Sequence, residues 1–133
     1  MASPGRVNLL GEHVVTEIKR IQQACRLLAQ DDVRAFGELM VASHNSLRDL
    51  YAVSCPELDA LVDSAIALPG CYGARLTGAG FGGCMVNLVN SECAQDFAKQ
   101  LEKSYLQKTG QKAQIYICQA ARGAYAEPVQ LNN

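Results

Sequence analysis

The chain has 133 residues, of which 49% are hydrophobic, with 12 basic and 13 acidic side chains and a formal net charge of -1. A chain of this length can form one domain that buries roughly 70% of its extended surface. Because its charges are nearly balanced and contain no long run of one sign, binding to nucleic acid or to an anionic membrane is not expected.

The first predicted elements lie in residues 3–30. The run SPGRVNLLGEH indicates a turn, a short strand and a second turn, because proline and glycine flank a short apolar stretch. From Val14 the apolar residues recur at helical spacing, with basic and amide side chains mostly on the other face. This pattern predicts an amphipathic helix over residues 14–30.

Two more helices are predicted before residue 70. Asp31 or Asp32 can cap the second helix, which the polar residues 43–46 could interrupt. We interpret its apolar stripe as core; the stripe consists of Val33, Phe36, Met40, Leu47 and Tyr51, joined by Leu39 and Leu50. The sequence Ser-Cys-Pro-Glu at residues 54–57 has the spacing of a capping box with proline in the first turn. It predicts a third helix that ends at Pro69 and Gly70.

The central stretch, residues 72–89, has the sequence YGARLTGAGFGGCMVNLV. It predicts two apolar strands joined by a loop with four glycines, at positions 78, 80, 82 and 83. Glycine adopts positive φ and lets backbone N–H groups approach a ligand, so the loop could hold a phosphate-sized anion. A plain glycine hairpin explains the same residues equally well, since glycine clusters mark turns more often than sites.

The last predicted elements complete the fold. Asn90 or Ser91 can cap a fourth helix, which Gly110 would end. Alternation over residues 112–118 predicts a third strand, and residues 120–133 are expected to form a loosely held tail. Helices before a strand–strand–helix–strand unit indicate an α+β fold. We expect a split βαβ (ferredoxin-like) arrangement with the helices packed on one face of a small antiparallel sheet.

The cysteines and the N-terminal residues bear on the compartment. Cys25, Cys84 and Cys118 lie in apolar periodic segments and no C-x-x-C pair occurs, which favours buried reduced thiols over disulfides. The residues MASPGR lack the apolar core of a signal peptide, and no apolar run approaches the roughly 18 residues of a membrane helix. We therefore expect a soluble protein of the cytoplasm.

Few side chains suit catalysis by a metal or a nucleophile. His13 and His44 are the two histidines, and neither has a partner at ligand spacing, so no metal site is predicted. Cys84 leads into an apolar strand and is interpreted as a packing residue. Neither the P-loop motif nor the glycine motif of protein kinases occurs, so phosphate chemistry would need another architecture.

Two distant stretches resemble one family. PGRVNLLGEH, residues 4–13, resembles the signature near the N-terminus of galactokinases, and RLTGAGFGGC, residues 75–84, resembles the third, glycine-rich motif of the GHMP kinase superfamily, to which galactokinases belong. Residues 37–59 are similar to the helical part of the galactokinase C-terminal domain. The resemblance implies that residues 1–13 are a remnant of the N-terminal signature and residues 14–133 are the GHMP kinase C-terminal domain.

The resemblance also contains a departure. In a complete galactokinase the signature continues past its histidine with threonine, aspartate and tyrosine and leads into a large N-terminal lobe, whereas here Val14 follows. That lobe carries the loop that wraps the nucleotide phosphates and the aspartate taken to be the catalytic base. The comparison implies an internal deletion and a truncated chain that is inactive alone. The alternative is a non-catalytic C-terminal module for binding or interaction, or an inactive remnant.

For the family, the resemblance implies transfer of the γ-phosphoryl group of ATP, with Mg²⁺ bound to the nucleotide, to the anomeric hydroxyl of galactose. Carried over by position, Arg6 would act in catalysis beside the reacting phosphate, and Glu12 and His13 would hydrogen-bond sugar hydroxyls. The loop residues that would line the cleft near sugar and phosphates are Thr77, Gly78, Ala79, Gly80, Phe81, Gly82 and Gly83. Whether this chain binds ATP and Mg²⁺ at all is left open, because the main nucleotide loop is missing.

Each of these assignments has a structural alternative. Without the lobe, the three N-terminal residues could belong to a displaced arm. His44 could face the cleft, although a hydrogen-bonded packing role is favoured, and Arg48 and Arg75 could reach phosphates, although exposed salt bridges are commoner for such side chains. The surface that faces the missing lobe should be apolar, so a homodimer or the displaced arm is predicted to cover it.

Overall fold

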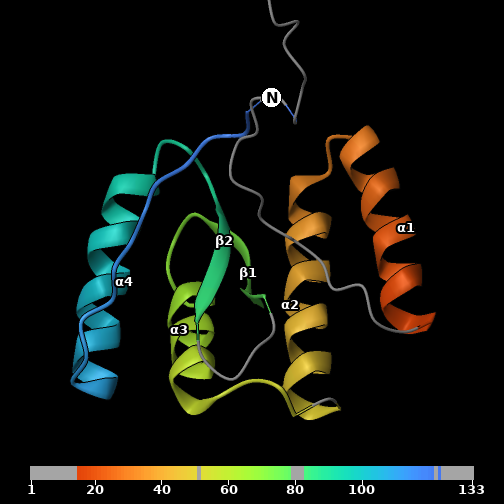
Figure 1. The fold of residues 1–133 in the computed structure, drawn as a ribbon. Helices are drawn as coiled ribbons and strands as arrows, with labels where there is room; N and C mark the ends of the chain where they lie inside the picture. Colours follow the sequence, from red (N-terminus) through yellow and green to blue (C-terminus); the bar gives the residue numbers. More distant parts are fainter. Residues whose placement is uncertain (1–14, 51, 79–82, 122, 124–133) are drawn as a thin grey trace, which may run out of the picture.

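The computed structural model describes residues 15–50, 52–78, 83–121 and 123. The elements follow one another as α1 (Val15–Ala29), α2 (Val33–Asp49), α3 (Pro56–Ile66), β1 (Cys71–Thr77), β2 (Cys84–Val89) and α4 (Ala94–Thr109). In Figure 1 the helices form a row in the order α4, α3, α2, α1, and the hairpin of β1 and β2 lies in front of α3, beside α2. The described helices include none that is both long and apolar enough to cross a membrane.

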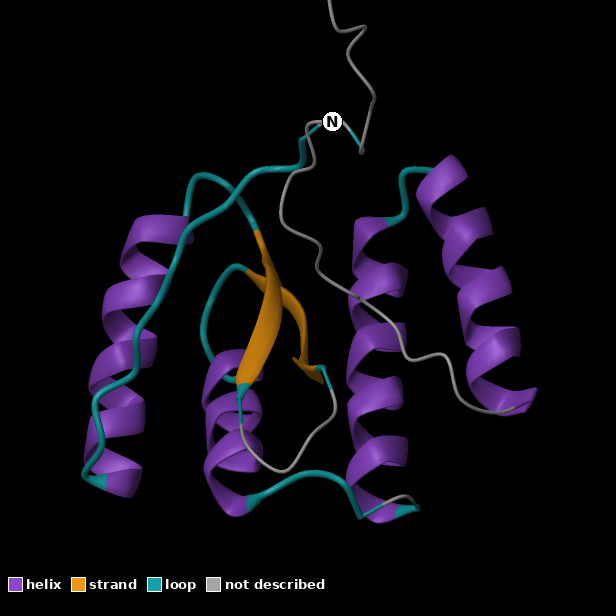
Figure 2. Cartoon of the chain, viewed as in Figure 1, coloured by secondary structure: helices purple, strands orange, loops and turns teal. Residues whose placement is uncertain are grey.

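The α+β fold is confirmed, with a sheet smaller than predicted. Among the described residues, β1 and β2 form a two-stranded antiparallel sheet, shown in orange in Figure 2. The predicted strand over residues 112–118 is wrong, since this segment forms no ladder in the described part. Ile115 packs against the core while Tyr116 is 73% exposed. Ala113 and Ile115 are half-buried and Ile117 is 49% exposed, so the alternation reflects partial contact with the core and not strand pairing.

The link between α1 and α2 follows the prediction. Asp32 caps α2 by accepting a hydrogen bond from the Ala35 N–H at 3.0 Å. Asp31 has a φ of 57°, a left-handed conformation that aspartate tolerates in turns.

The interruption of α2 predicted at residues 43–46 is wrong, because α2 continues through them. Their polar side chains do not compete with the helix backbone, since Ser43 and His44 bond to groups outside α2.

The ends of α3 and α4 differ in part from their predicted signals. Cys55, without a side-chain bond, is the N-cap of α3, and the predicted capping box fails because the Ser54 hydroxyl donates to Asp59 at 2.6 Å. The helix ends at Ile66, before the predicted stop. Cys93 is the N-cap of α4 in place of Asn90 or Ser91. The predicted C-terminal stop of α4 is confirmed, since Gly110 has a φ of 71°.

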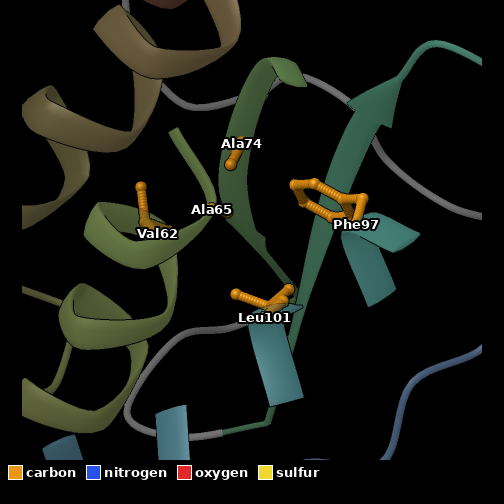
Figure 3. Close-up of a cluster of buried hydrophobic side chains, with 5 residues drawn as sticks. All are labelled: Val62, Ala65, Ala74, Phe97 and Leu101. Carbon is orange, nitrogen blue, oxygen red and sulfur yellow. The ribbon is translucent and has the colours of Figure 1, made fainter. Parts of the chain in front are cut away.

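Three clusters of buried side chains make up the core. Figure 3 shows the first, in which side chains of α3, β1 and α4 point toward one another: Val62, Ala65, Ala74, Phe97 and Leu101. The second joins α1 to α2 and to β2, and consists of Ala24, Phe36 and Met40 with Val86 and Leu88 against them. The third joins α2, α3 and β1 through Leu47, Leu58 and Leu76. The core assignment of Phe36, Met40 and Leu47 is thus confirmed, whereas Leu50 is 77% exposed, so its place in the core stripe is wrong. Tyr51 lies outside the described residues.

The hairpin is enclosed by helix residues. Residues 73–76 of β1 are all buried, so both faces of this strand are covered. On β2, Val86 packs with the cluster of α1 and α2, whereas its neighbour Met85 packs with the clusters of α3. Adjacent residues of a strand point to opposite faces, so the α1–α2 pair and the α3–α4 pair hold the hairpin from two sides. The prediction that the helices pack on one face of the sheet is therefore wrong.

The backbones of α2 and β1 touch. A Cβ added to Gly37 would lie 2.0 Å from the carbonyl oxygen of Tyr72, and one added to Gly73 would lie 2.2 Å from the carbonyl oxygen of Gly37. Glycine at both positions therefore allows an approach that any side chain would prevent. This contact places β1 directly on α2.

Candidate functional site

The glycine loop, residues 78–83, joins β1 to β2 and is described at its two ends. The ladder closes with the pair Thr77 and Cys84, and Gly78 and Gly83 have φ values of 85° and 112°. In the described part of the chain no atom lies within 4 Å of a Cβ added at either glycine. Glycine is thus required here for backbone conformation and not for space. The prediction of two strands joined by a glycine loop is confirmed, and the anion site stays a hypothesis.

Most of the predicted site residues lie outside the described residues. They are Arg6, Glu12, His13, Ala79, Gly80, Phe81 and Gly82. Thr77 is half-buried at the end of β1, and Gly78 and Gly83 are exposed. Of the predicted site, the structure therefore describes the two ends of the glycine loop.

A first polar cluster, the His44 cluster, holds the end of β1 that leads into the loop. Nδ1 of His44 accepts the N–H of Leu76 at 3.3 Å, and Nε2 lies 3.2 Å from Oδ1 of Asp59. The same oxygen accepts the hydroxyl of Ser54 at 2.6 Å. Burial lowers the pKa of His44, and the nearby Asp59 acts in the opposite direction. The favoured prediction of a hydrogen-bonded packing residue is confirmed for His44.

A second polar cluster, the Glu17 cluster, lies between α1, α2 and β1. The Glu17 carboxylate accepts the Ser43 hydroxyl at 2.8 Å and forms an ion pair with Arg20. Arg75 of β1 is 2% exposed; its Nε donates to the carbonyl of Leu76 at 2.9 Å, and its Nη1 has no partner among the described residues. Burial lowers the pKa of Arg75, and the charge of Glu17 opposes this shift.

The two arginines considered as phosphate ligands have different outcomes. Arg48 forms the expected exposed ion pair, with its Nε 2.8 Å from Oδ1 of Asp49. The expectation of an exposed salt bridge is wrong for Arg75, because β1 is covered on both faces and its guanidinium is buried. In the described structure Arg75 points toward the core and not toward solvent.

The thiol prediction is correct in one part and wrong in another. All six cysteines are free, as predicted. Cys25, Cys84 and Cys118 are exposed, however, so the prediction that they are buried is wrong. Cys84 lies at the ladder end beside the glycine loop and is exposed, so its interpretation as a packing residue is wrong as well. No group of three or more His, Cys, Asp or Glu side chains that could hold a metal ion occurs in the described ranges.

Sequence reasoning missed Glu17, Ser43 and Asp59 as buried or bonded residues. One signal was present for Ser43. Together with His44 it lies between Met40 and Leu47 at helical spacing, on the apolar stripe of α2, and both are fully buried. Polar residues inside an apolar stripe indicate partners from other elements.

Comparisons with known proteins agree on one family. The family described as GHMP kinases C terminal matches residues 21–107. Human galactokinase is 53% identical over 112 residues, which cover 84% of this chain and 28% of that protein. The galactokinase of Roseiflexus sp. (strain RS-1) is 47% identical over 120 residues, which cover 90% of this chain and 31% of that protein. The chain therefore spans only about three tenths of the length of the curated relatives it matches.

Solved structures give the same result. The crystal structure of Lactococcus lactis galactokinase complexed with galactose has a TM-score of 0.77 and 39% identity, covering 82% of this chain and 28% of that chain. The structure of L. major mevalonate kinase in complex with R-mevalonate has a TM-score of 0.54 and 29% identity. The match covers 68% of this chain and 26% of that chain. The described fold is thus shared with longer kinases.

Proposed function

Because this chain belongs to the family of GHMP kinase C-terminal domains, we propose that it supplies the C-terminal part of a galactokinase. Such an enzyme transfers the γ-phosphoryl group of ATP to the anomeric hydroxyl of galactose to give galactose 1-phosphate. The observation that carries the proposal is the glycine loop, whose ends have positive φ, in a chain 53% identical to human galactokinase over 112 residues. The likeness to a galactose-bound galactokinase supports this choice of sugar.

The contribution of this part of the enzyme would be positioning. Phosphoryl transfer depends mainly on alignment of the reactants and on neutralising charge around the moving group. Backbone N–H groups of the glycine loop would face the sugar and phosphates. Arg6 would stabilise the reacting phosphate, and Glu12 and His13 would bind sugar hydroxyls. Mg²⁺ would arrive with ATP, because Mg²⁺ at kinase sites is held by the substrate phosphates together with one or two carboxylates.

We propose further that the 133-residue polypeptide does not turn over galactose by itself. Its sequence contains the third family motif but no match to the loop that wraps the nucleotide phosphates. A coupled assay of ATP consumption with and without galactose tests this on the purified polypeptide. Galactose-dependent turnover above the blank would contradict it.

A chimera tests the proposed function directly. Residues 14–133 would replace the C-terminal domain of human galactokinase, and we expect galactose-dependent ATP turnover. Gly78→Val should lower the turnover at least about tenfold, because a β-branched residue is strained at a φ of 85°. Gly110→Val is the matched control, since Gly110 has a φ of 71° and similarly open space but lies at the end of α4.

A folded chimera without turnover would instead favour the alternative, a non-catalytic binding or interaction module. Galactose binding, measured by calorimetry on the same chimera, separates the two outcomes. Binding without turnover supports a binding module, and turnover supports the kinase. Absence of both in a folded chimera would reject the assignment to galactose.

Homodimerisation and a cytoplasmic location are also proposed. The described surface carries large apolar side chains that are at least 43% exposed, and those on the helices are Ile18, Leu28, Ile66 and Leu106. Exposed apolar side chains that gather in one patch are candidates for a covered interface. Light scattering should give a dimer mass, and a monodisperse monomer would contradict the proposed homodimer.

Six free cysteines support the proposed cytoplasmic location, because free thiols persist in a reducing compartment.

A further inference from the structure

His44 satisfies a buried backbone amide at the end of β1 that leads into the glycine loop. The Leu76 N–H donates to Nδ1 of His44 at 3.3 Å, across 32 positions of the sequence. Leu76 is 1% exposed and His44 is fully buried, so bulk water cannot replace the imidazole. Because β1 pairs with β2 alone in the described part of the chain, its outward N–H groups need acceptors other than β2. His44 provides one of them.

The bonds around the imidazole fix its tautomer. Because Nδ1 accepts the Leu76 N–H, it carries no hydrogen of its own. Nε2 then carries the hydrogen and donates it to Oδ1 of Asp59 at 3.2 Å. The Ser54 hydroxyl donates to the same oxygen at 2.6 Å and so helps to orient Asp59. The His44 cluster therefore holds a neutral imidazole in one orientation.

The Leu76 bond is the second of two attachments of β1 to α2. The first is the backbone contact of Gly37 with Tyr72 and Gly73. From Gly37 to His44, α2 rises by about 10 Å, and from Gly73 to Leu76, β1 also rises by about 10 Å. The two attachments are equally spaced on both elements. Together they hold β1 against α2 from Gly73 to Leu76.

We propose that His44 is a positioning residue for Gly78, the described start of the glycine loop, acting through the Leu76 amide to set where the backbone leaves β1. The proposal rests on the proposed function in taking the loop as part of the binding site. Gly78 follows Leu76 by two residues and has a φ of 85°. Leu76 is bonded directly to Thr77, and Gly78 follows the last ladder pair, Thr77 and Cys84, so a displacement of Leu76 is passed along the backbone toward Gly78.

Protonation of His44 should release the Leu76 amide. An imidazolium carries a hydrogen on Nδ1 and cannot accept one from Leu76. Burial lowers the pKa of His44 below its ordinary value, and the nearby Asp59 opposes this. Arg48 of α2 lowers the pKa further, and Asp63 of α3 raises it. The release is therefore expected in acid, below the usual range of histidine.

Two substitutions in the isotope-labelled full chain separate the two ends of the imidazole. His44→Gln places an amide near Nε2, so it can reach Asp59 but leaves Leu76 without an acceptor. His44→Asn places an amide oxygen near Nδ1, so it can still accept the Leu76 N–H. Phe97→Leu is a control that destabilises the α4 side of the core without touching His44.

Amide hydrogen exchange and amide chemical shifts, measured by NMR, are the readouts. In His44→Gln we expect the Leu76 amide to exchange about fivefold faster than in Phe97→Leu, compared at equal global stability. The resonances of Gly78 and Gly83 should shift in the same variant. His44→Asn should restore most of the Leu76 protection and of both glycine shifts. Equal exchange in His44→Gln and Phe97→Leu, with unshifted glycines, would overturn the proposal.

The unmodified chain provides a test that does not depend on folded variants. The ¹⁵N shifts of the imidazole should show an unprotonated Nδ1 and a protonated Nε2 at neutral pH, and the opposite tautomer would overturn the proposal. On acidification, the shifts of Leu76, Gly78 and Gly83 should change together with those of the His44 ring. None of these readouts requires turnover. A folded chimera with neither turnover nor galactose binding would therefore reject the proposed function and leave this proposal to be decided by NMR.

Discussion

The Glu17 cluster and the His44 cluster lie side by side on α2, through the neighbouring residues Ser43 and His44, but they are stabilised differently. The Glu17 cluster buries formal charges, a carboxylate and the Arg75 guanidinium, and leaves Nη1 of Arg75 without a partner among the described residues. In the His44 cluster a neutral imidazole has both nitrogens bonded, and its one charged member, Asp59, keeps 26% of its side chain exposed. The first cluster therefore depends on charge balance, and the second on hydrogen-bond direction.

Among the substitutions that test this comparison, Glu17→Ala should lower the free energy of unfolding most. It removes the acceptor of Ser43 and leaves Arg75 buried without an opposite charge, so we expect a loss of about 3 kcal/mol in the free energy of unfolding. Urea denaturation measures it. The double variant Glu17→Ala with Arg75→Met should recover part of the loss, because both charges are gone. Strict additivity of the two single losses would contradict charge balance as the cause.

Gly73→Ala should disturb both clusters together. The added methyl group would lie 2.2 Å from the Gly37 carbonyl oxygen and would push β1 away from α2, at a cost of about 2 kcal/mol. Gly123→Ala is the control, since nothing in the described chain lies within 4 Å of that position. Thermal unfolding measures both variants. A Gly73→Ala protein as stable as the control would show that this contact does not hold β1.

Acid should weaken the His44 cluster. The folded pKa of His44 lies below its ordinary value of 6.5, so between these two values the unfolded chain binds more protons. The contribution of the neutral His44 imidazole to the free energy of unfolding is fully present above the ordinary pKa. It is lost as the pH falls through the folded pKa, with a slope of at most about 1.4 kcal/mol per pH unit. Urea denaturation at several pH values measures the slope. His44→Gln should reduce it, and an unchanged slope in that variant would assign the effect to other groups.

Ser54→Ala should have the smallest effect. It removes one hydrogen bond to Asp59, for an expected loss of about 1 kcal/mol in the free energy of unfolding. Because the bond between His44 and Leu76 remains, the Leu76 amide should keep its protection from exchange. Chemical denaturation together with NMR exchange checks both parts. Faster exchange at Leu76 would show that Asp59 loses its orientation without Ser54.

Local signals were sufficient for most of the fold, and remote partners account for the rest. Apolar spacing, the Asp32 cap and the Gly110 stop lie within the segments they define, so α1, the start of α2 and the end of α4 were predictable. The polar residues 43–46 suggested a break because their partners are not local: Ser43 bonds to a residue 26 positions away. The burial of Arg75 likewise follows from helices on both faces of β1, which no local pattern reveals.

The candidate site shows the same contrast between features that local sequence signals predict and features that depend on remote partners. The glycine loop was visible in the sequence because its conformation depends on its own residues, and the positive φ values of Gly78 and Gly83 follow from that. The His44 cluster that holds its first end combines α2, α3 and β1, and Ser54 was assigned to a capping box instead. Family resemblance pointed to the loop and not to the residues behind it.

The equal spacing of the two attachments between α2 and β1 has a consequence for how these segments can change in length. Inserting or deleting one residue between Gly37 and His44 would rotate the helix by about 100° and turn one attachment away from the strand. One residue more or less between Gly73 and Leu76 would turn the strand over. Related sequences should therefore vary in length at the turns that flank these segments and stay gap-free within them.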